Sequence, residues 1–296
     1  MPRFVIVLIL ISVLLSACGY GTASNTPAVA PAILASTTLL ADIARQVAGT
    51  RVEVGSLLPF GADAHNYQPT PADVMKIAES KVFILNGAGY ETSLAPYLQN
   101  NAQGKIIISA SKDISVRMNE NQQDPHFWLD PTLVIIYVEN IRDGLIAYDP
   151  IGADEYRINA ENYIAELKKL DEWIKEQVNQ IPVERRLLVT NHEALGYFAA
   201  RYGFTIVGAV IESFSADASP SARQMANLIE QIKNNNAPAI FLDAADNPAL
   251  AEQIASESGV KVISDLYLES LTNGAPAESY IEFMRYNVMK IVSALK

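Results

Sequence analysis

The stretch ADEYRINAENYIAELKKLDEWIKEQVNQ, residues 153–180, is the strongest indication of the architecture of this chain. It contains no Gly or Pro, and its apolar residues recur at spacings of three and four from Tyr156 to Val178. This period predicts one long amphipathic helix with a buried stripe and a solvated face. Because the helix is longer than most helices of globular proteins, we expect it to connect two lobes.

On both sides of this stretch, short apolar runs rich in β-branched residues alternate with helical periods. Strands are predicted at residues 32–36, 52–57, 82–85 and 105–109, and again at 186–190, 205–209, 239–242 and 261–264. Helices are predicted at residues 39–48, 71–80, 92–99 and 131–147, and again at 193–201, 220–234, 248–258 and 278–295. This alternation predicts an α/β fold of two lobes, each with a mainly parallel four-stranded sheet.

The length of 296 residues also favours two domains, because a single core stops growing before this size. We expect an N-terminal α/β lobe at residues 32–150, the connecting helix at 151–181 and a C-terminal α/β lobe at 182–296.

Residues 1–17 are predicted to be a lipoprotein signal peptide. The apolar run Phe4–Leu15 is too short to span a bilayer, which needs about 20 residues. It leads into Leu-Ser-Ala-Cys, which resembles a bacterial lipobox and makes Cys18 the lipidated N-terminus; the alternative is an ordinary secretory peptide with an incidental cysteine. Residues 18–31 are small and polar, and predict a flexible tether. We therefore expect an extracytoplasmic protein that is lipid-anchored to the bacterial cell membrane.

The composition excludes several classes of site and partner. The formal net charge of −11 provides no basic surface for nucleic acid, so neither DNA nor RNA is expected as a partner. A single cysteine rules out an intramolecular disulfide, a cysteine-based zinc finger and an iron–sulfur site. A metal site would therefore depend on carboxylates and on the 3 histidines of the chain.

All three histidines lie beyond the carboxyl ends of predicted strands. His65 stands in GADAHNYQPTP, His126 in DPHFWLDP and His192 in VTNHEALGYF. Ligands of open α/β sheets bind at this edge. Because two of the histidines belong to the first lobe and one to the second, a shared site would lie between the lobes.

A fourth ligand is expected from the second lobe. Asp265 follows the predicted strand at residues 261–264 at the same edge, and a carboxylate would complete a four-coordinate shell. The other candidates are Asp243, Asp246 and Glu193, and the alternative role of Asp265 is a helix N-cap.

Motifs of common enzymes are missing from the sequence. His192 and Glu193 begin like the zincin motif HExxH, but Gly196 stands where the second histidine is required. The chain also has no Walker loop and no GxSxG nucleophile motif. No enzymatic activity is expected.

Several motifs occur in an order that is typical of one family: LLPFGADAHNYQPTPADV at 57–74, ILNGAGYE at 84–91, DPHFWLDP at 124–131 and VTNHEALGYFAARYGF at 189–204. With the leader and the long helix, they make the chain resemble the metal-binding substrate-binding lipoproteins of zinc/manganese ABC transporters, the cluster A-I family. The resemblance implies a metal ion between the lobes, held by His65, His126, His192 and Asp265. It also implies delivery to a transporter permease that a separate ATPase drives, and we expect a monomer.

The identity of the metal is open between zinc and manganese, with iron third. Many zinc-specific members of the family carry a His-rich loop before the second ligand, whereas residues 111–123 contain no histidine. Three imidazoles and one carboxylate nevertheless suit tetrahedral Zn²⁺, and manganese-selective relatives often have Glu where this chain has His192. We favour zinc.

Two other functions are considered beside that of a metal-binding receptor. One is a zinc-dependent extracytoplasmic hydrolase, which four protein ligands would oppose because they leave no open position on the ion. The other is an adhesin.

Overall fold

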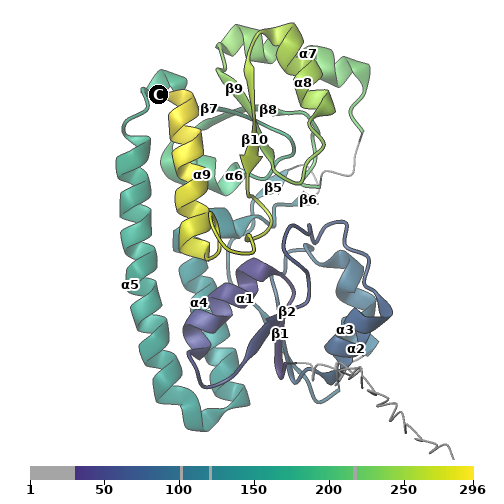
Figure 1. Ribbon diagram of the computed structural model, residues 1–296, viewed down its shortest axis with the longest axis vertical. Coiled ribbons are helices and arrows are strands. Elements are labelled where there is room, and N and C mark those ends of the chain that lie inside the picture. The colour runs from purple at the N-terminus through teal and green to yellow at the C-terminus, as the bar shows by residue number, and fades with distance from the viewer. Residues whose placement is uncertain (1–30, 101–102, 120–121, 216–218) are drawn as a thin grey trace, which may run out of the picture.

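The protein consists of two α/β lobes beside one long helix (Figure 1). The computed structural model describes residues 31–100, 103–119, 122–215 and 219–296. The predicted signal peptide at 1–17, Cys18 and nearly all of the tether at 18–31 lie outside the described residues. Within the described ranges, no helix combines the length and the hydropathy that a membrane span needs.

The first lobe is built on a parallel sheet with the strand order β2-β1-β3-β4. Its strands are β1 (Ile33–Ala35), β2 (Val54–Ser56), β3 (Val82–Leu85) and β4 (Ile106–Ser109). Its helices are α1 (Thr38–Ala48), α2 (Pro71–Glu79) and α3 (Ala95–Asn100).

The second lobe repeats this plan with the strand order β10-β9-β7-β8, again parallel. Its strands are β7 (Leu187–Thr190), β8 (Thr205–Ala209), β9 (Ala239–Asp243) and β10 (Lys261–Leu266). Its helices are α6 (Gly196–Tyr202), α7 (Ala222–Asn235) and α8 (Ala249–Ser258). The predicted fold class, two mainly parallel four-stranded lobes joined by a long helix, is confirmed.

Three long helices hold the lobes together along one side of the molecule (Figure 1). They are α4 (Pro131–Tyr148), α5 (Ala153–Val178) and the C-terminal α9 (Tyr280–Leu295). Helix α5 packs against α1, α4 and α9, and the predicted apolar stripe from Tyr156 to Val178 is buried. The last helix of the chain therefore lies on the connecting helix and close to α1 of the first lobe, rather than on its own sheet alone.

Both sheets reverse their direction of strand addition in the middle, between β1 and β3 in one and between β7 and β9 in the other. Such switch points leave a crevice outside the carboxyl ends of the strands. The two crevices face each other, because Tyr90, beyond β3, contacts Glu269, beyond β10.

Two differences from the sequence-based expectation lie close to the candidate ligands. A short hairpin of β5 (Met118–Asn119) and β6 (Gln122–Gln123) precedes His126 and was not predicted. Strand β10 continues through Leu266 instead of ending at residue 264, so Asp265 lies within the strand and not beyond it. Because β10 is an edge strand of its sheet, polar side chains on it meet solvent and do not end it.

Candidate metal centre

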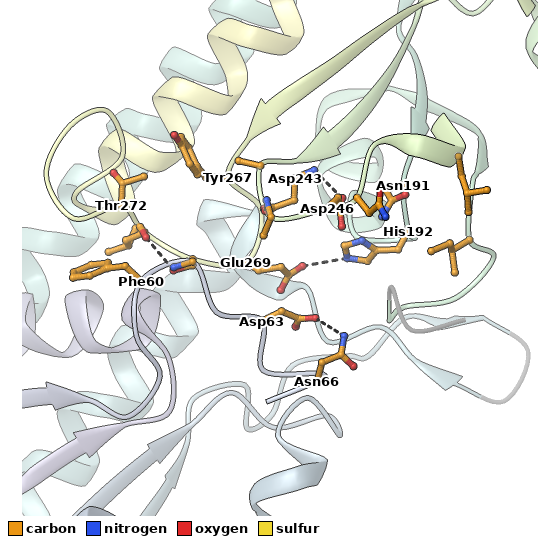
Figure 2. A pocket seen from close by; sticks show the side chains of 18 of the residues that line it. Phe60, Asp63, Asn66, Asn191, His192, Asp243, Asp246, Tyr267, Glu269 and Thr272 are labelled. Atoms are coloured by element: carbon orange, nitrogen blue, oxygen red, sulfur yellow. Dashed lines mark hydrogen bonds and ion pairs between the residues drawn. The ribbon is translucent and has the colours of Figure 1, made fainter. Parts of the chain in front are cut away.

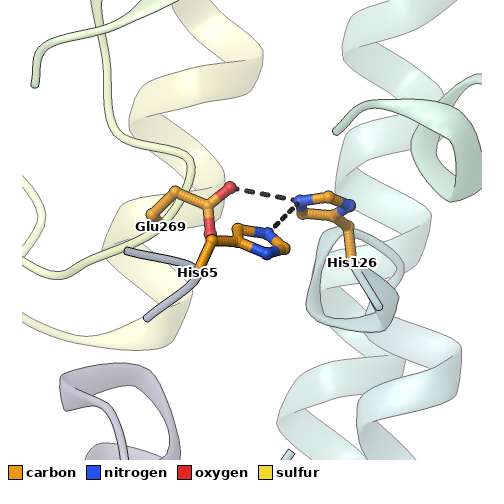
Figure 3. A group of neighbouring side chains, drawn as sticks. All are labelled: His65, His126 and Glu269. Atoms are coloured by element: carbon orange, nitrogen blue, oxygen red, sulfur yellow. Dashed lines mark hydrogen bonds and ion pairs between the residues drawn. The ribbon is translucent and has the colours of Figure 1, made fainter. Parts of the chain in front are cut away.

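Four side chains converge between the lobes: His65, His126, His192 and Glu269. The Nε2 atoms of His65 and His126 are 3.4 Å apart. Oε1 of Glu269 lies 3.3 Å from Nε2 of His126 and 3.2 Å from Nε2 of His192. Figure 3 shows the first two histidines and Glu269 pointing toward one another, and Figure 2 shows the contact between His192 and Glu269.

These interatomic distances match those between neighbouring ligand atoms of a tetrahedrally coordinated ion. Zinc bonds of about 2.0–2.1 Å in tetrahedral geometry place neighbouring ligand atoms about 3.3–3.4 Å apart. Candidate ligand atoms of His65, His126 and Glu269 all lie within 4.8 Å of one another, and His192 joins them through Glu269. His65, His126 and Glu269 therefore have the donor types and the spacing of three ligands of one metal ion, and His192 lies beside Glu269 as the fourth donor.

The structure does not bring Asp265 to this cluster. Its side chain is about half exposed and forms an ion pair with Lys290 of α9, and Tyr286 donates a hydrogen bond to it. The choice of Asp265 followed from ending β10 two residues too early. The carboxylate beside the histidines belongs to Glu269, three residues beyond the true end of the strand.

The other acidic candidates lie near the cluster without joining it. The carboxylate of Asp243 accepts hydrogen bonds from the backbone N–H groups of Ala245 and Leu268. The carboxylate of Asp246 accepts one from the backbone N–H of Asp243. Asp243 and Asp246 therefore stabilise the loop after β9 through hydrogen bonds to backbone N–H groups. Glu193 follows His192 directly, and its backbone N–H bonds to the carbonyl of Ser213.

His126 is fully buried and is held by Asp124, a residue that the sequence analysis did not single out. Nδ1 of His126 lies 2.9 Å from Oδ1 of Asp124, and because a carboxylate only accepts, Nδ1 carries the proton. This leaves Nε2 directed at the cluster, which is the arrangement that metal-binding histidines usually show. Asp124 also forms an ion pair with Arg117 at 3.6 Å.

The two first-lobe histidines have opposite pKa shifts. Burial lowers the pKa of His65 to about 4. For His126 burial acts in the same direction, but the negative charge of Glu269 and the hydrogen bond to Asp124 outweigh it and raise the pKa to about 9. Although burial opposes its charge, the pKa of Glu269 is lowered well below its usual value by His126 and His192. In the metal-free protein at neutral pH, both ring nitrogens of His126 are therefore protonated and Glu269 is an anion.

The second carboxylate oxygen of Glu269 is already engaged. Oε2 accepts a hydrogen bond of 2.7 Å from the hydroxyl of Tyr90, which is buried. Only Oε1 faces the imidazoles, so this carboxylate is arranged to offer one oxygen and not two.

An acidic cavity of about 840 Å³ adjoins the cluster on the side of His192 and Glu269 (Figure 2). Asp63 lines it, and its carboxylate fixes the loop of His65 by accepting a hydrogen bond from the backbone N–H of that residue. Burial and the charge of Glu269 raise the pKa of Asp63 to about 7. With Asp243, Asp246 and Glu269 on the same walls, the cavity favours the approach of a cation.

Comparison with known families finds one that matches most of the chain. The family described as "ZnuA: Zinc-uptake complex component A periplasmic" matches residues 33–294. The manganese-binding lipoprotein MntA of Halalkalibacterium halodurans is 32% identical over 295 residues, which cover 99% of this chain and 98% of that protein. The manganese ABC transporter substrate-binding lipoprotein PsaA of Streptococcus pneumoniae is 29% identical, with 95% of this chain and 94% of that protein covered.

Solved structures with the same fold include proteins named for different metals. The periplasmic zinc-binding protein TroA of Treponema pallidum superposes with a TM-score of 0.84 at 26% identity, covering 90% of this chain and 99% of that one. The Mn-bound periplasmic metal-binding protein of Candidatus Liberibacter asiaticus gives a TM-score of 0.79 at 30% identity, covering 89% of this chain and 99% of that one.

Proposed function

The chain belongs to the family of periplasmic zinc-uptake components, and from this premise we propose that it captures one Zn²⁺ with His65, His126, His192 and Glu269. It is a metal-binding substrate-binding lipoprotein of an ABC transporter, and it works outside the cytoplasm. Its partners are the permease and the ATPase of that transporter. Since the family consists of binding proteins, the hydrolase alternative is wrong, and an adhesive role is not proposed.

The donor set supports zinc rather than manganese. Three imidazoles and one carboxylate oxygen suit tetrahedral Zn²⁺, whereas Mn²⁺ favours sites richer in oxygen. The hydrogen bond from Tyr90 to Oε2 of Glu269 leaves a single carboxylate oxygen for the ion. The relatives named for manganese make this preference the point to test.

Metal analysis of the isolated protein tests the preference. The full chain is expressed in cells grown with equal zinc and manganese, and is purified without added metal. We expect about one zinc per chain and little manganese. Because most N/O sites bind zinc more tightly than manganese in vitro, the metal acquired in the cell is a better criterion than affinity alone. Manganese at about one per chain would contradict the zinc assignment.

We also propose that Cys18 anchors the protein to the membrane through its lipid. Cys18→Ala removes the only thiol of the chain, so the variant is expected to lose membrane association or to remain unprocessed. Fractionation of cells into membrane and soluble proteins measures this. Ser12→Ala, in the apolar run of the same leader, is the matched control and is expected to fractionate like the original protein. Membrane association that survives Cys18→Ala after signal-peptide cleavage would refute the anchor.

A further inference from the structure

The segment that carries Glu269 follows β10 of the second lobe but makes its next contacts with the first lobe. Up to the backbone N–H of Leu268, which donates to Asp243, its hydrogen bonds stay in the second lobe. The next hydrogen bonds go to the first lobe, except that Oε1 of Glu269 also lies 3.2 Å from Nε2 of His192 in the second lobe. The carbonyl of Leu268 accepts a hydrogen bond of 2.7 Å from Nε1 of Trp128, and Glu269 accepts the one from Tyr90.

The next two residues continue the attachment to the first lobe. Oγ1 of Thr38, at the start of α1, accepts a hydrogen bond of 3.0 Å from the backbone N–H of Leu271 and lies 3.1 Å from Oγ of Ser270. Oγ of Ser270 also accepts a hydrogen bond of 2.8 Å from the backbone N–H of Gly61. Thr38, Ser270 and Leu271 are all buried, so these bonds are shielded from water.

The backbone around His192 is connected differently. The N–H of Asn191 donates to the carbonyl of Phe241 in β9, at 3.1 Å, and the N–H of Glu193 donates to the carbonyl of Ser213, at 2.9 Å. Both partners belong to the second lobe. Among the described residues, a hydrogen bond from the first half of the chain reaches this backbone three residues beyond Glu193, where the guanidinium of Arg117 donates to the carbonyl of Gly196.

We propose that Thr38 is a positioning residue that holds Glu269 on the first lobe. His65, His126 and Glu269 then form a half-site that exists before the metal arrives, and His192 is the ligand that the second lobe adds. This inference deepens the proposed function and rests on it for the role of the ion. The attachment of residues 269–271 does not depend on metal, so it can be tested separately.

Amide hydrogen exchange in the metal-free full-length protein tests the attachment. Thr38→Val keeps the shape of the side chain but leaves the N–H of Leu271 buried without an acceptor. We expect the Leu271 amide to exchange roughly tenfold faster in this variant, because the unsatisfied N–H destabilises the closed state relative to the open state from which exchange occurs. Thr38→Ser keeps the hydroxyl and is expected to retain the slow exchange. The Asn191 amide serves as the internal control and should not change in either variant.

The same variants test the half-site in zinc binding. We expect zinc to leave the Thr38→Val protein about tenfold faster than the Thr38→Ser protein, which is the lower end of the effect of losing a supporting contact at a metal site. Addition of zinc to the unaltered protein should slow exchange at residues 191–195 and leave residues 269–271 as they were. Protection of residues 269–271 only after zinc is added would overturn the proposal. So would equal exchange of the Leu271 amide in the two variants. Absence of zinc binding would instead refute the proposed function, and the metal-free exchange data would still decide the attachment.

Discussion

Glu269→Ala is expected to weaken zinc binding by about a hundredfold to a thousandfold, whereas Asp265→Ala leaves the affinity unchanged. Four-ligand zinc sites bind with about 10–16 kcal/mol, so an equal share for one ligand of four is about 2.5–4 kcal/mol. Asp265→Ala is the matched control for Glu269→Ala, since Asp265 is an acidic residue of the same lobe and its ion pair with Lys290 lies at the surface. Competition of each variant with a chromophoric zinc chelator gives the two affinities.

A loss in Asp265→Ala as large as that in Glu269→Ala would refute the assignment of the fourth ligand. Glu269→Gln adds a second control, because it keeps the length of the side chain and removes its charge. The affinity of this variant is expected to lie between those of Glu269→Ala and the unaltered protein.

Zinc affinity is expected to fall at least about tenfold for each pH unit below about 9, and therefore at least about a hundredfold between pH 7 and pH 5. The cause is His126, whose pKa of about 9 leaves Nε2 protonated where the zinc bond must form. Below this pKa a proton must leave Nε2 of His126 before zinc binds, so zinc affinity decreases as the pH falls. His65, with a pKa of about 4, is neutral in this range and adds no such requirement above pH 4.

Calorimetry at pH 7 in buffers of different ionisation enthalpy counts the protons released. At least one proton per zinc is expected from His126. Asp124→Asn removes the carboxylate that helps to raise the pKa of His126, so this variant should release fewer protons at the same pH. Release of no proton by the unaltered protein at pH 7 would contradict the protonated state of His126.

The lobes and the long helix could be predicted because their signals are local. The apolar residues of α5 recur with the helical period, and the strands are short runs of β-branched residues that can be recognised without knowledge of the fold. Strands β3 at Val82–Leu85 and β8 at Thr205–Ala209 were predicted with the observed limits. The hairpin β5–β6 has only two residues in each strand, which is too short to produce a period.

The histidines were predictable for a different reason. The chain has only 3 histidines, and each lies beyond the end of a strand. This shared position indicated that they belong to one site. Glu269 was missed because Ser264 and Asp265 suggested the end of a strand that continues to Leu266. The same rule applied to the true end of β10 points to the segment that carries Glu269. The roles of Asp124 and Tyr90 depend on contacts across the fold, which no sequence pattern shows.

X-ray absorption spectroscopy of the zinc-loaded protein tests the central claim most directly. The technique reports the number, type and distance of the atoms bound to zinc. The cluster of His65, His126, His192 and Glu269 predicts four ligands, three imidazole nitrogens and one oxygen, at about 2.0–2.1 Å. A shell of six mainly oxygen ligands, or one with fewer than two imidazoles, would contradict it.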